Sequence, residues 1–194
     1  SHLIAPLFIK DGADLKTPIS SMPNIFRLNL NEALAEVEEL LNLDIQCISL
    51  FPVIEHHLKD ETASYSYNEK NILLKSIREI KKRFPEMMIM SDVAMDPYSS
   101  HGHDGLYSEQ TKKVLNDETL PILAKMAIAQ AASGSDIIGP SDMMDGRVGF
   151  LRKALDSEGF TETSIMSYTA KYASNFYGPF RDALDSAPKF GDKK

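Results

Sequence analysis

The stretch LNEALAEVEELLNLDIQCISLFPV, residues 30–53, places an amphipathic helical pattern directly before a short apolar run. Apolar side chains recur on one helical face over residues 30–41, and Asn29 with Glu32 forms a capping-box-like start. Residues 45–53 are continuously apolar rather than alternating, a pattern typical of a strand that is buried on both faces. The stretch therefore predicts a helix that leads into a buried strand.

The same alternation continues in both directions along the chain. Further apolar runs lie at residues 3–9, 87–93, 136–139 and 164–169. Further helical patterns lie at residues 69–84, 119–132, 147–157 and from about 176. Repeated strand and helix units of this kind predict a parallel sheet that is joined by right-handed crossovers.

Two α/β architectures fit five parallel strands: an open doubly wound sheet, and the first five strands of a TIM (β/α)8 barrel. No G-x-G-x-x-G fingerprint follows a strand, since Gly102, Gly105 and Gly146 do not form one. This absence favours the barrel. We therefore expect residues 1–194 to form a single domain, an incomplete TIM barrel that stops before the barrel closes.

The composition excludes several classes of protein. The 194 residues are 43% hydrophobic and 25% charged, which is ordinary for a folded globular chain and excludes disordered and collagen-like chains. The net charge of -7 has the wrong sign for a protein that tracks nucleic acid phosphates. Cys47 is the only cysteine, which excludes an internal disulfide and indicates a reducing compartment. No apolar run is long enough to span a membrane, so we expect an intracellular protein with neither a membrane nor a nucleic acid partner.

Polar side chains follow four of the five predicted strands, at the edge where parallel α/β proteins gather their active sites. They are Glu55, His56 and His57 after the second strand, Asp92, Asp96, His101, His103 and Asp104 around the end of the third, Ser141, Asp142 and Asp145 after the fourth, and Lys171 after the fifth. Ser141 or Asp142 is also a good N-cap for the next helix. Of the adjacent pair His56 and His57, we expect one side chain to pack and the other to be solvated.

The long segment over residues 95–110 contains His101-x-His103 together with Asp96 and Asp104. Imidazole and carboxylate groups are ligands for zinc, iron or manganese, so a metal-dependent hydrolase is one interpretation. The alternative is a solvated loop whose Asp and His side chains cap turns. The residues alone leave both interpretations open.

Lys171 directly follows a buried apolar run, so we expect its amine to be partly desolvated, with a lowered pKa suited to attack on a carbonyl. The alternative is an ordinary surface lysine at the end of a strand. The aromatic residues that follow, among them Phe176 and Tyr177, suit either a pocket wall or core packing. Arg181 is the candidate clamp for a substrate carboxylate.

Four motifs resemble the delta-aminolevulinic acid dehydratases, also called porphobilinogen synthases. They are APLFI (5–9), DVAMDPYSSHGHDG (92–105), PSDMMDGRV (140–148) and SYTAKYASNFYGPFRDA (167–183), and the resemblance covers the chain from end to end. The resemblance implies a TIM barrel and a hydro-lyase of tetrapyrrole (haem) biosynthesis. Such an enzyme condenses two molecules of 5-aminolevulinate to porphobilinogen with loss of two waters.

The resemblance also implies roles for individual residues. Lys171 matches a lysine that forms a Schiff base with substrate. Arg181 and the lid residue Lys193 match the groups that bind the substrate carboxylate. Asp92 and Ser141 match polar residues that line the same pocket.

The metal pattern resembles the members of the family that carry aspartate. Zinc-dependent members have three cysteines where this sequence has Ala94, Asp96 and Asp104. The resemblance therefore implies no organic cofactor, no catalytic zinc, and Mg²⁺ as an activator whose ligand lies beyond Lys194. It also implies a homo-oligomer, an octamer or a lower assembly, in the cytoplasm or, after removal of a transit peptide, in an organellar stroma.

Length separates this sequence from the family. Members of the family carry an N-terminal arm before the APLFI strand and a C-terminal part with a second Schiff-base lysine, and neither is present here. A non-catalytic truncated fragment of such an enzyme is therefore the alternative to the catalytic interpretation.

Overall fold

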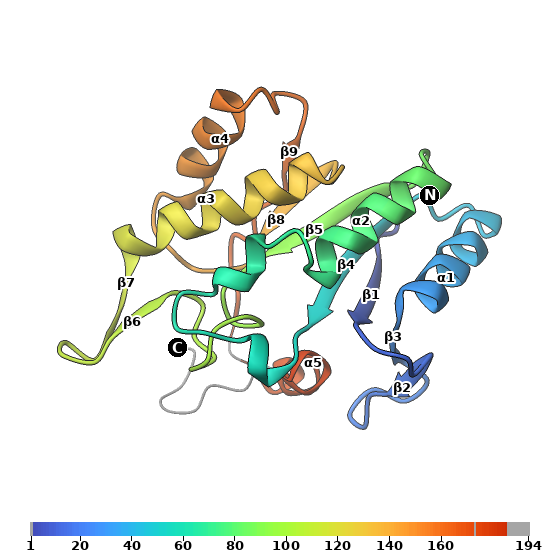
Figure 1. Cartoon of the computed structure of the whole chain (residues 1–194), viewed down its shortest axis with the longest axis horizontal. Helices are drawn as coiled ribbons and strands as arrows, with labels where there is room; N and C mark the ends of the chain where they lie inside the picture. Colours follow the sequence, from blue (N-terminus) through green and yellow to red (C-terminus); the bar gives the residue numbers. More distant parts are fainter. Residues whose placement is uncertain (1, 173, 186–194) are drawn as a thin grey trace.

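A seven-stranded sheet forms the centre of the computed structural model, which describes residues 2–172 and 174–185 (Figure 1). The strand order is β2-β3-β1-β4-β5-β8-β9. The bounds are β1 Ala5–Lys10, β2 Lys16–Pro18, β3 Phe26–Leu28, β4 Cys47–Val53, β5 Met88–Val93, β8 Ile137–Pro140 and β9 Ser164–Ile165. Strands β1, β4, β5, β8 and β9 pair in parallel with their neighbours, which confirms the five predicted parallel strands.

The helices decide between the two predicted architectures. Their bounds are α1 Leu30–Asn42, α2 Ile72–Arg83, α3 Asn116–Ala132, α4 Arg147–Ser157 and α5 Gly178–Leu184. Helices α1 to α4 all cover the same face of the sheet (Figure 1). A doubly wound sheet carries helices on both faces, whereas a barrel carries them only on the outside. The fold is therefore an α/β half-barrel that is not closed.

Side chains alternate across the parallel strands, and the two faces contact different partners. Leu7, Ile9, Ile48 and Leu50 are buried in the core beneath the helices. Phe8 and Phe51 point to the other face, where they pack with Ile19 and α5. This second face also carries an open groove of about 390 Å³, which extends from β1 across β4 and β5 to the residues after β9.

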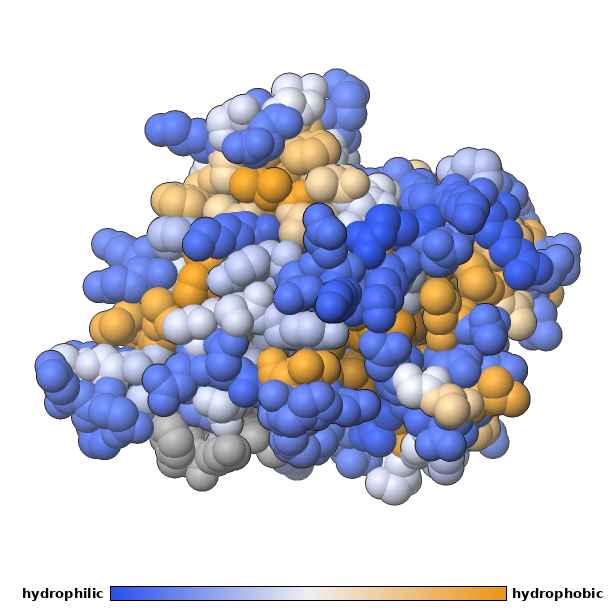
Figure 2. Space-filling view, in the orientation of Figure 1, coloured by the Kyte–Doolittle hydropathy of each residue, from blue (hydrophilic) through white to orange (hydrophobic). Residues whose placement is uncertain are grey.

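The outer surface of the helices carries both hydrophilic and apolar areas. Figure 2 shows a mainly hydrophilic surface over α2, with apolar patches towards α4 and towards α1. No helix among residues 2–172 and 174–185 is long and apolar enough to cross a lipid bilayer.

Local side-chain bonds set where the helices begin. Asn29 Oδ1 accepts a hydrogen bond from the Glu32 backbone N–H at 3.0 Å, which confirms Asn29 as the predicted N-cap of α1. Asn71 Oδ1 accepts a hydrogen bond from the Leu73 backbone N–H at 2.9 Å, so α2 begins at Ile72 and not at residue 69. The expectation that Ser141 or Asp142 caps α4 is wrong, because the N-cap is Gly146, in the left-handed region with φ of 76°.

Several short elements were not predicted from the sequence. Strands β2 and β3 have three residues each, and a hairpin of β6 (Leu106–Ser108) and β7 (Lys113–Leu115) projects before α3 (Figure 1). Three residues are too few to show a periodic pattern. The predicted strand over residues 164–169 is only two residues long, although Tyr168 N–H still donates to Pro140 O at 3.3 Å.

Shortening a buried side chain of the central strand β4 tests the core beneath the helices. Leu50→Ala should lower the free energy of unfolding by about 3 kcal/mol, because Leu50 is fully buried and its loss leaves a cavity. Leu43→Ala is the matched control, since Leu43 is 71% exposed. Urea denaturation measures both variants, and equal losses would contradict the assignment of this core.

Candidate active site

A cavity of about 260 Å³ lies at the carboxyl ends of the parallel strands. Its lining comes from β4, from β5 and the turn after it, from the segments after β8 and β9, and from the C-terminal residues around α5. The lining residues are Phe51, Asp92, Asp96, Ser141, Tyr168, Lys171, Tyr177, Phe180 and Leu184. Because parallel strands end at one edge, residues far apart in sequence meet there.

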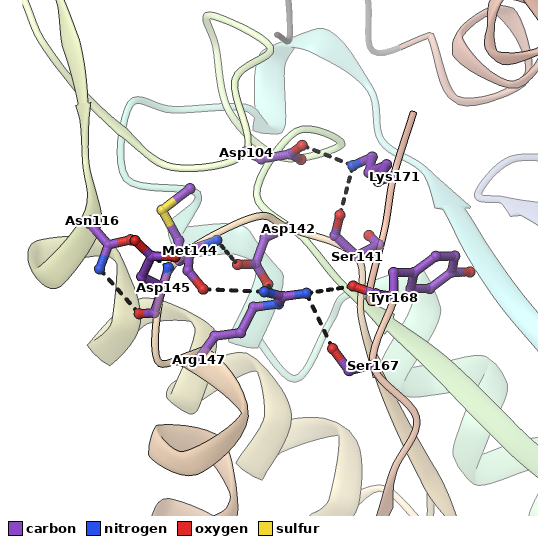
Figure 3. Close-up of polar contacts among 10 residues, drawn as sticks. All are labelled: Asp104, Asn116, Ser141, Asp142, Met144, Asp145, Arg147, Ser167, Tyr168 and Lys171. Atoms are coloured by element: carbon purple, nitrogen blue, oxygen red, sulfur yellow. Dashed lines mark hydrogen bonds and ion pairs between the residues drawn. The ribbon is translucent and has the colours of Figure 1, made fainter. Parts of the chain in front are cut away.

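Lys171 is the cation of this cavity, and two acceptors hold its ammonium group. Nζ donates to Asp104 Oδ2 at 3.0 Å and to the Ser141 backbone carbonyl at 2.7 Å (Figure 3). Burial lowers the pKa of Lys171, but the carboxylates of Asp104 and Asp96 outweigh it, so that the pKa lies above its ordinary value. The expected lowering of the pKa is therefore wrong for this state of the site, in which the amine is protonated.

Asp92 is a carboxyl group suited to proton transfer. It is 6% exposed, and among the described residues its Oδ1 has no hydrogen-bond partner. Burial raises the pKa of Asp92 to about 7, with the Ser141 hydroxyl and Lys171 acting in the opposite direction and Asp96 adding to the rise. A carboxyl group with this pKa both gives and takes a proton near neutral pH.

Aromatic side chains form the wall of the cavity. The ring centroid of Tyr177 lies 5.7 Å from Lys171 Nζ and 5.0 Å from the Arg181 guanidinium carbon, so both cations face one ring. Phe180 meets Phe51 edge-on, with ring centroids 5.1 Å apart. These contacts place α5 against β4.

Polar bonds fix α5 to the N-terminal part of the chain. The Asp182 carboxylate accepts from the Ser20 hydroxyl at 3.0 Å and from the Ser21 hydroxyl at 2.6 Å. Arg27 Nε donates to the Ala183 carbonyl at 2.9 Å. The helix that carries Phe180 and directly follows Tyr177 is therefore held by residues more than 150 positions earlier in the sequence.

A second set of contacts holds the loop between β8 and α4 (Figure 3). Asp142, which is fully buried, accepts from Met144 N–H at 2.8 Å and lies 3.6 Å from Arg147 Nε. Burial raises the pKa of Asp142 to about 6, although the bond from Met144 and the charge of Arg147 lower it. Asn116 pairs with the Asp145 backbone, accepting from its N–H at 2.7 Å and donating to its carbonyl at 3.2 Å.

The structure brings together most of the predicted site residues. Lys171, Asp92, Ser141 and Tyr177 line one cavity, and Arg181 lies beside it. Lys193 and the side chain of Phe176 lie outside the described part of the chain.

Other cavity residues had no predicted role toward a substrate. Asp96 was expected at the active-site edge of the sheet and as a candidate metal ligand, whereas Tyr168 and Phe51 lie within apolar runs that gave no signal of a site. Asp104, also considered as a metal ligand, instead binds Lys171.

The candidate metal site at His101 and His103, one of the two interpretations left open, is not supported by the described residues. Over residues 2–172 and 174–185, no group of three or more His, Cys, Asp and Glu side chains is placed to hold a metal ion. His101 Nδ1 accepts from the His103 backbone N–H at 3.2 Å, and the His103 ring stacks on Tyr107. The rings therefore stabilise their loop.

The expectation for the tandem histidines is also wrong. The side chains of His56 and His57 are 75% and 70% exposed, so neither packs into the core.

Removing the carboxylate beside Lys171 tests the charge balance of the cavity. Asp104→Asn should lower the pKa of Lys171, because burial then acts against the ammonium with less compensation. A pH titration of ¹³C-methylated lysines by NMR measures the change. Asp145→Asn, an exposed site on the neighbouring loop, should leave Lys171 unchanged, and an equal effect of both substitutions would contradict the assignment.

The raised pKa of Asp92 predicts a pH-dependent stability. The folded protein holds this proton up to about pH 7, whereas the unfolded chain releases it near the ordinary value of 3.8. The carboxyl group thus lowers stability progressively as pH rises from about 4 to about 7. Asp92→Asn should be more stable than the native protein at pH 8 by up to about 4 kcal/mol, and equally stable near pH 4. Urea denaturation at both pH values measures the difference, and Asp14→Asn, whose side chain is 86% exposed, should show none.

Comparison with known proteins identifies relatives along the whole chain. The family model described as delta-aminolevulinic acid dehydratase matches residues 1–194. The chloroplastic delta-aminolevulinic acid dehydratase of Glycine max is 51% identical over 100% of this chain and 47% of its own length. The enzyme of that name from Chlamydia pneumoniae is 50% identical over 99% of this chain and 57% of its own length.

A solved structure agrees in fold as well as in sequence. The crystal structure of delta-aminolevulinic acid dehydratase (porphobilinogen synthase) from Toxoplasma gondii, in complex with the reaction product porphobilinogen, superposes with a TM-score of 0.95 at 48% identity. The match covers 98% of this chain and 54% of that chain. This chain thus spans about half the length of the relatives that it matches. With the family model matching from end to end and relatives at about 50% identity, the chain belongs to the delta-aminolevulinic acid dehydratase family.

Proposed function

We propose that this chain forms part of a hydro-lyase that condenses two molecules of 5-aminolevulinate to porphobilinogen with loss of two waters. The observation that carries the proposal is the placement of Lys171 in a cavity beside Asp92, Ser141 and Tyr177. An amine, a carboxyl group that titrates near neutral pH and an aromatic wall are the groups that imine chemistry on a small keto acid requires. The family supports the same reaction, since a relative was solved with porphobilinogen bound.

The first step needs a neutral amine on Lys171. Asp104, whose Oδ2 lies 3.0 Å from Nζ, is placed to take the proton. The amine then attacks the substrate ketone to form a carbinolamine, which loses its hydroxyl group as water to give the protonated Schiff base. Asp92 in its protonated form donates the proton that makes the hydroxyl a leaving group, and as a carboxylate it then accepts one from the carbon next to the imine.

The substrate carboxylate is the second point of recognition. We propose that Arg181 binds it, with Lys193 as the second cation, because a guanidinium matches a carboxylate in two parallel hydrogen bonds. Tyr177 lies against both Arg181 and Lys171, so one ring sets the spacing between the carboxylate and the ketone. Phe176 remains a predicted member of this wall.

The side chains at the cavity support a proposal about the metal. Asp96 and Asp104 stand where zinc-dependent members carry cysteines, and Asp104 instead binds the Lys171 ammonium. The donor set therefore does not fit a thiolate-bound zinc, and we propose zinc-independent chemistry with Mg²⁺ as an activator bound beyond Lys194. A homo-oligomer, an octamer or a lower assembly, and a location in the cytoplasm or an organellar stroma stay predictions from the sequence.

Trapping the Schiff base tests the proposed function. Incubation with 5-aminolevulinate followed by borohydride should add one substrate, less water and plus two hydrogens, at Lys171, as peptide mass mapping shows. Lys171→Met should abolish this adduct. Lys125→Met is the matched control, since Lys125 is an exposed lysine that also lies over a tyrosine ring, that of Tyr67.

The alternative outcome is equally definite. A native protein that yields no adduct at Lys171 and no porphobilinogen is a non-catalytic member of the family. An adduct that persists in Lys171→Met would place the amine chemistry on another residue.

A further inference from the structure

Two arginines of α4 bind backbone carbonyl groups in the segments just before and just after β9. Arg152 donates to Thr163 O at 2.5 Å and to Phe160 O at 2.7 Å, before the strand begins. Arg147 donates to Tyr168 O at 2.7 Å and to Ser167 Oγ at 3.2 Å, after the strand has ended (Figure 3). One helix therefore holds both ends of this segment, and Arg147 holds the end that leads to Lys171.

The backbone pairing of β9 is too short to position Lys171 alone. The strand has two residues, and the bonds to the β8 segment include Ser164 N–H to Asp136 O at 2.9 Å, Met166 N–H to Ile138 O at 2.9 Å and Tyr168 N–H to Pro140 O at 3.3 Å. The bond nearest to Lys171 is the longest of the three. Two residues are fewer than a strand usually has, so the side-chain bonds of Arg147 add to the few backbone bonds at this end.

Arg147 also holds the loop that supplies an acceptor for Lys171. It donates to Met144 O at 3.2 Å and lies 3.6 Å from the carboxylate of Asp142, in a pair whose side chains are 14% and 0% exposed. This loop begins with Ser141, whose carbonyl accepts from Lys171 Nζ. The same guanidinium therefore contacts the backbone that carries the amine and the loop that binds it.

We infer that Arg147 is a positioning residue that holds the Lys171 amine against the Ser141 carbonyl and the Asp104 carboxylate. It acts through the backbone at Ser167 and Tyr168, and it is not one of the residues that line the cavity. The inference rests on the proposed function only for the statement that Lys171 is the reacting amine. A planar fork with several donors suits this role, because it binds groups on two segments at once.

Competitive labelling of lysines tests the inference without substrate. Arg147→Met and Arg152→Met each remove a guanidinium that binds one end of β9. The readout is the acetylation of Lys171 by acetic anhydride at pH 8, relative to Lys81 in the same molecule. Lys81 is the internal control, since it is 23% exposed and lies 2.8 Å from Asp136 at the opposite end of the strands.

We expect Arg147→Met to raise the ratio of Lys171 to Lys81 labelling by at least about threefold, because a displaced amine loses its carboxylate partner and is deprotonated more often. Arg152→Met should leave the ratio within about 1.5-fold of the native value, because it acts at the far end of the strand. Arg147→Lys keeps the charge beside Asp142 but cannot span both segments, so its ratio should lie between those of the native protein and Arg147→Met. If Arg147→Met does not fold, the labelling ratio of Arg147→Lys tests the inference, and it should then exceed that of the native protein.

An unchanged ratio in the Arg147 variants, or an equal rise in Arg152→Met, would overturn the inference. An unchanged ratio in which the labelling of Lys171 and Lys81 rises equally would indicate a general loosening of the fold. Borohydride trapping at saturating 5-aminolevulinate is the second measurement, and it should fall in Arg147→Met but not in Arg152→Met. If the native protein traps no substrate, the proposed function fails, while the labelling ratio still decides the role of Arg147.

Discussion

Parallel pairing of β1, β4, β5, β8 and β9 determines where the helices and the cavity lie. Each helix that covers the outer face returns the chain to the same end of the sheet, so all five strands finish at one edge. Phe51, Asp92, Ser141 and Lys171 come from four separate strands or the turns after them, and they meet in one cavity for this reason. No local contact between neighbouring residues in the sequence brings them together.

The charges in this cavity oppose one another, and the balance defines its resting state. Burial works against the Lys171 ammonium, but the two nearby carboxylates of Asp104 and Asp96 stabilise it more strongly. For Asp92, burial outweighs the opposing effects of the Ser141 hydroxyl and the Lys171 charge, so its pKa rises to about 7. The Lys171 amine is thus protonated beside the Asp104 carboxylate, with the Asp92 carboxyl group in the same cavity. Proton transfer from Lys171 must therefore precede its attack on a ketone.

The segment that carries Lys171 and the aromatic wall is held from outside the cavity. Helix α5 is fixed by Asp182, which binds Ser20 and Ser21, and by Arg27. The end of β9 is fixed by Arg147 from α4. Side chains that never touch the cavity thereby set the distances inside it, as expected when catalytic groups lie on short or irregular segments.

Local sequence patterns were enough to predict the order of helices and buried strands, because apolar periodicity and capping residues such as Asn29 act over a few neighbouring positions. Its motifs also identified the family and most of the cavity, including Lys171, Asp92 and Ser141. The three-dimensional arrangement was needed to show that Asp104 pairs with Lys171, that the pKa of the lysine is raised, and that Arg147 bridges two loops. Those properties depend on distances between segments far apart in the chain, and such distances are set by packing rather than by any local pattern.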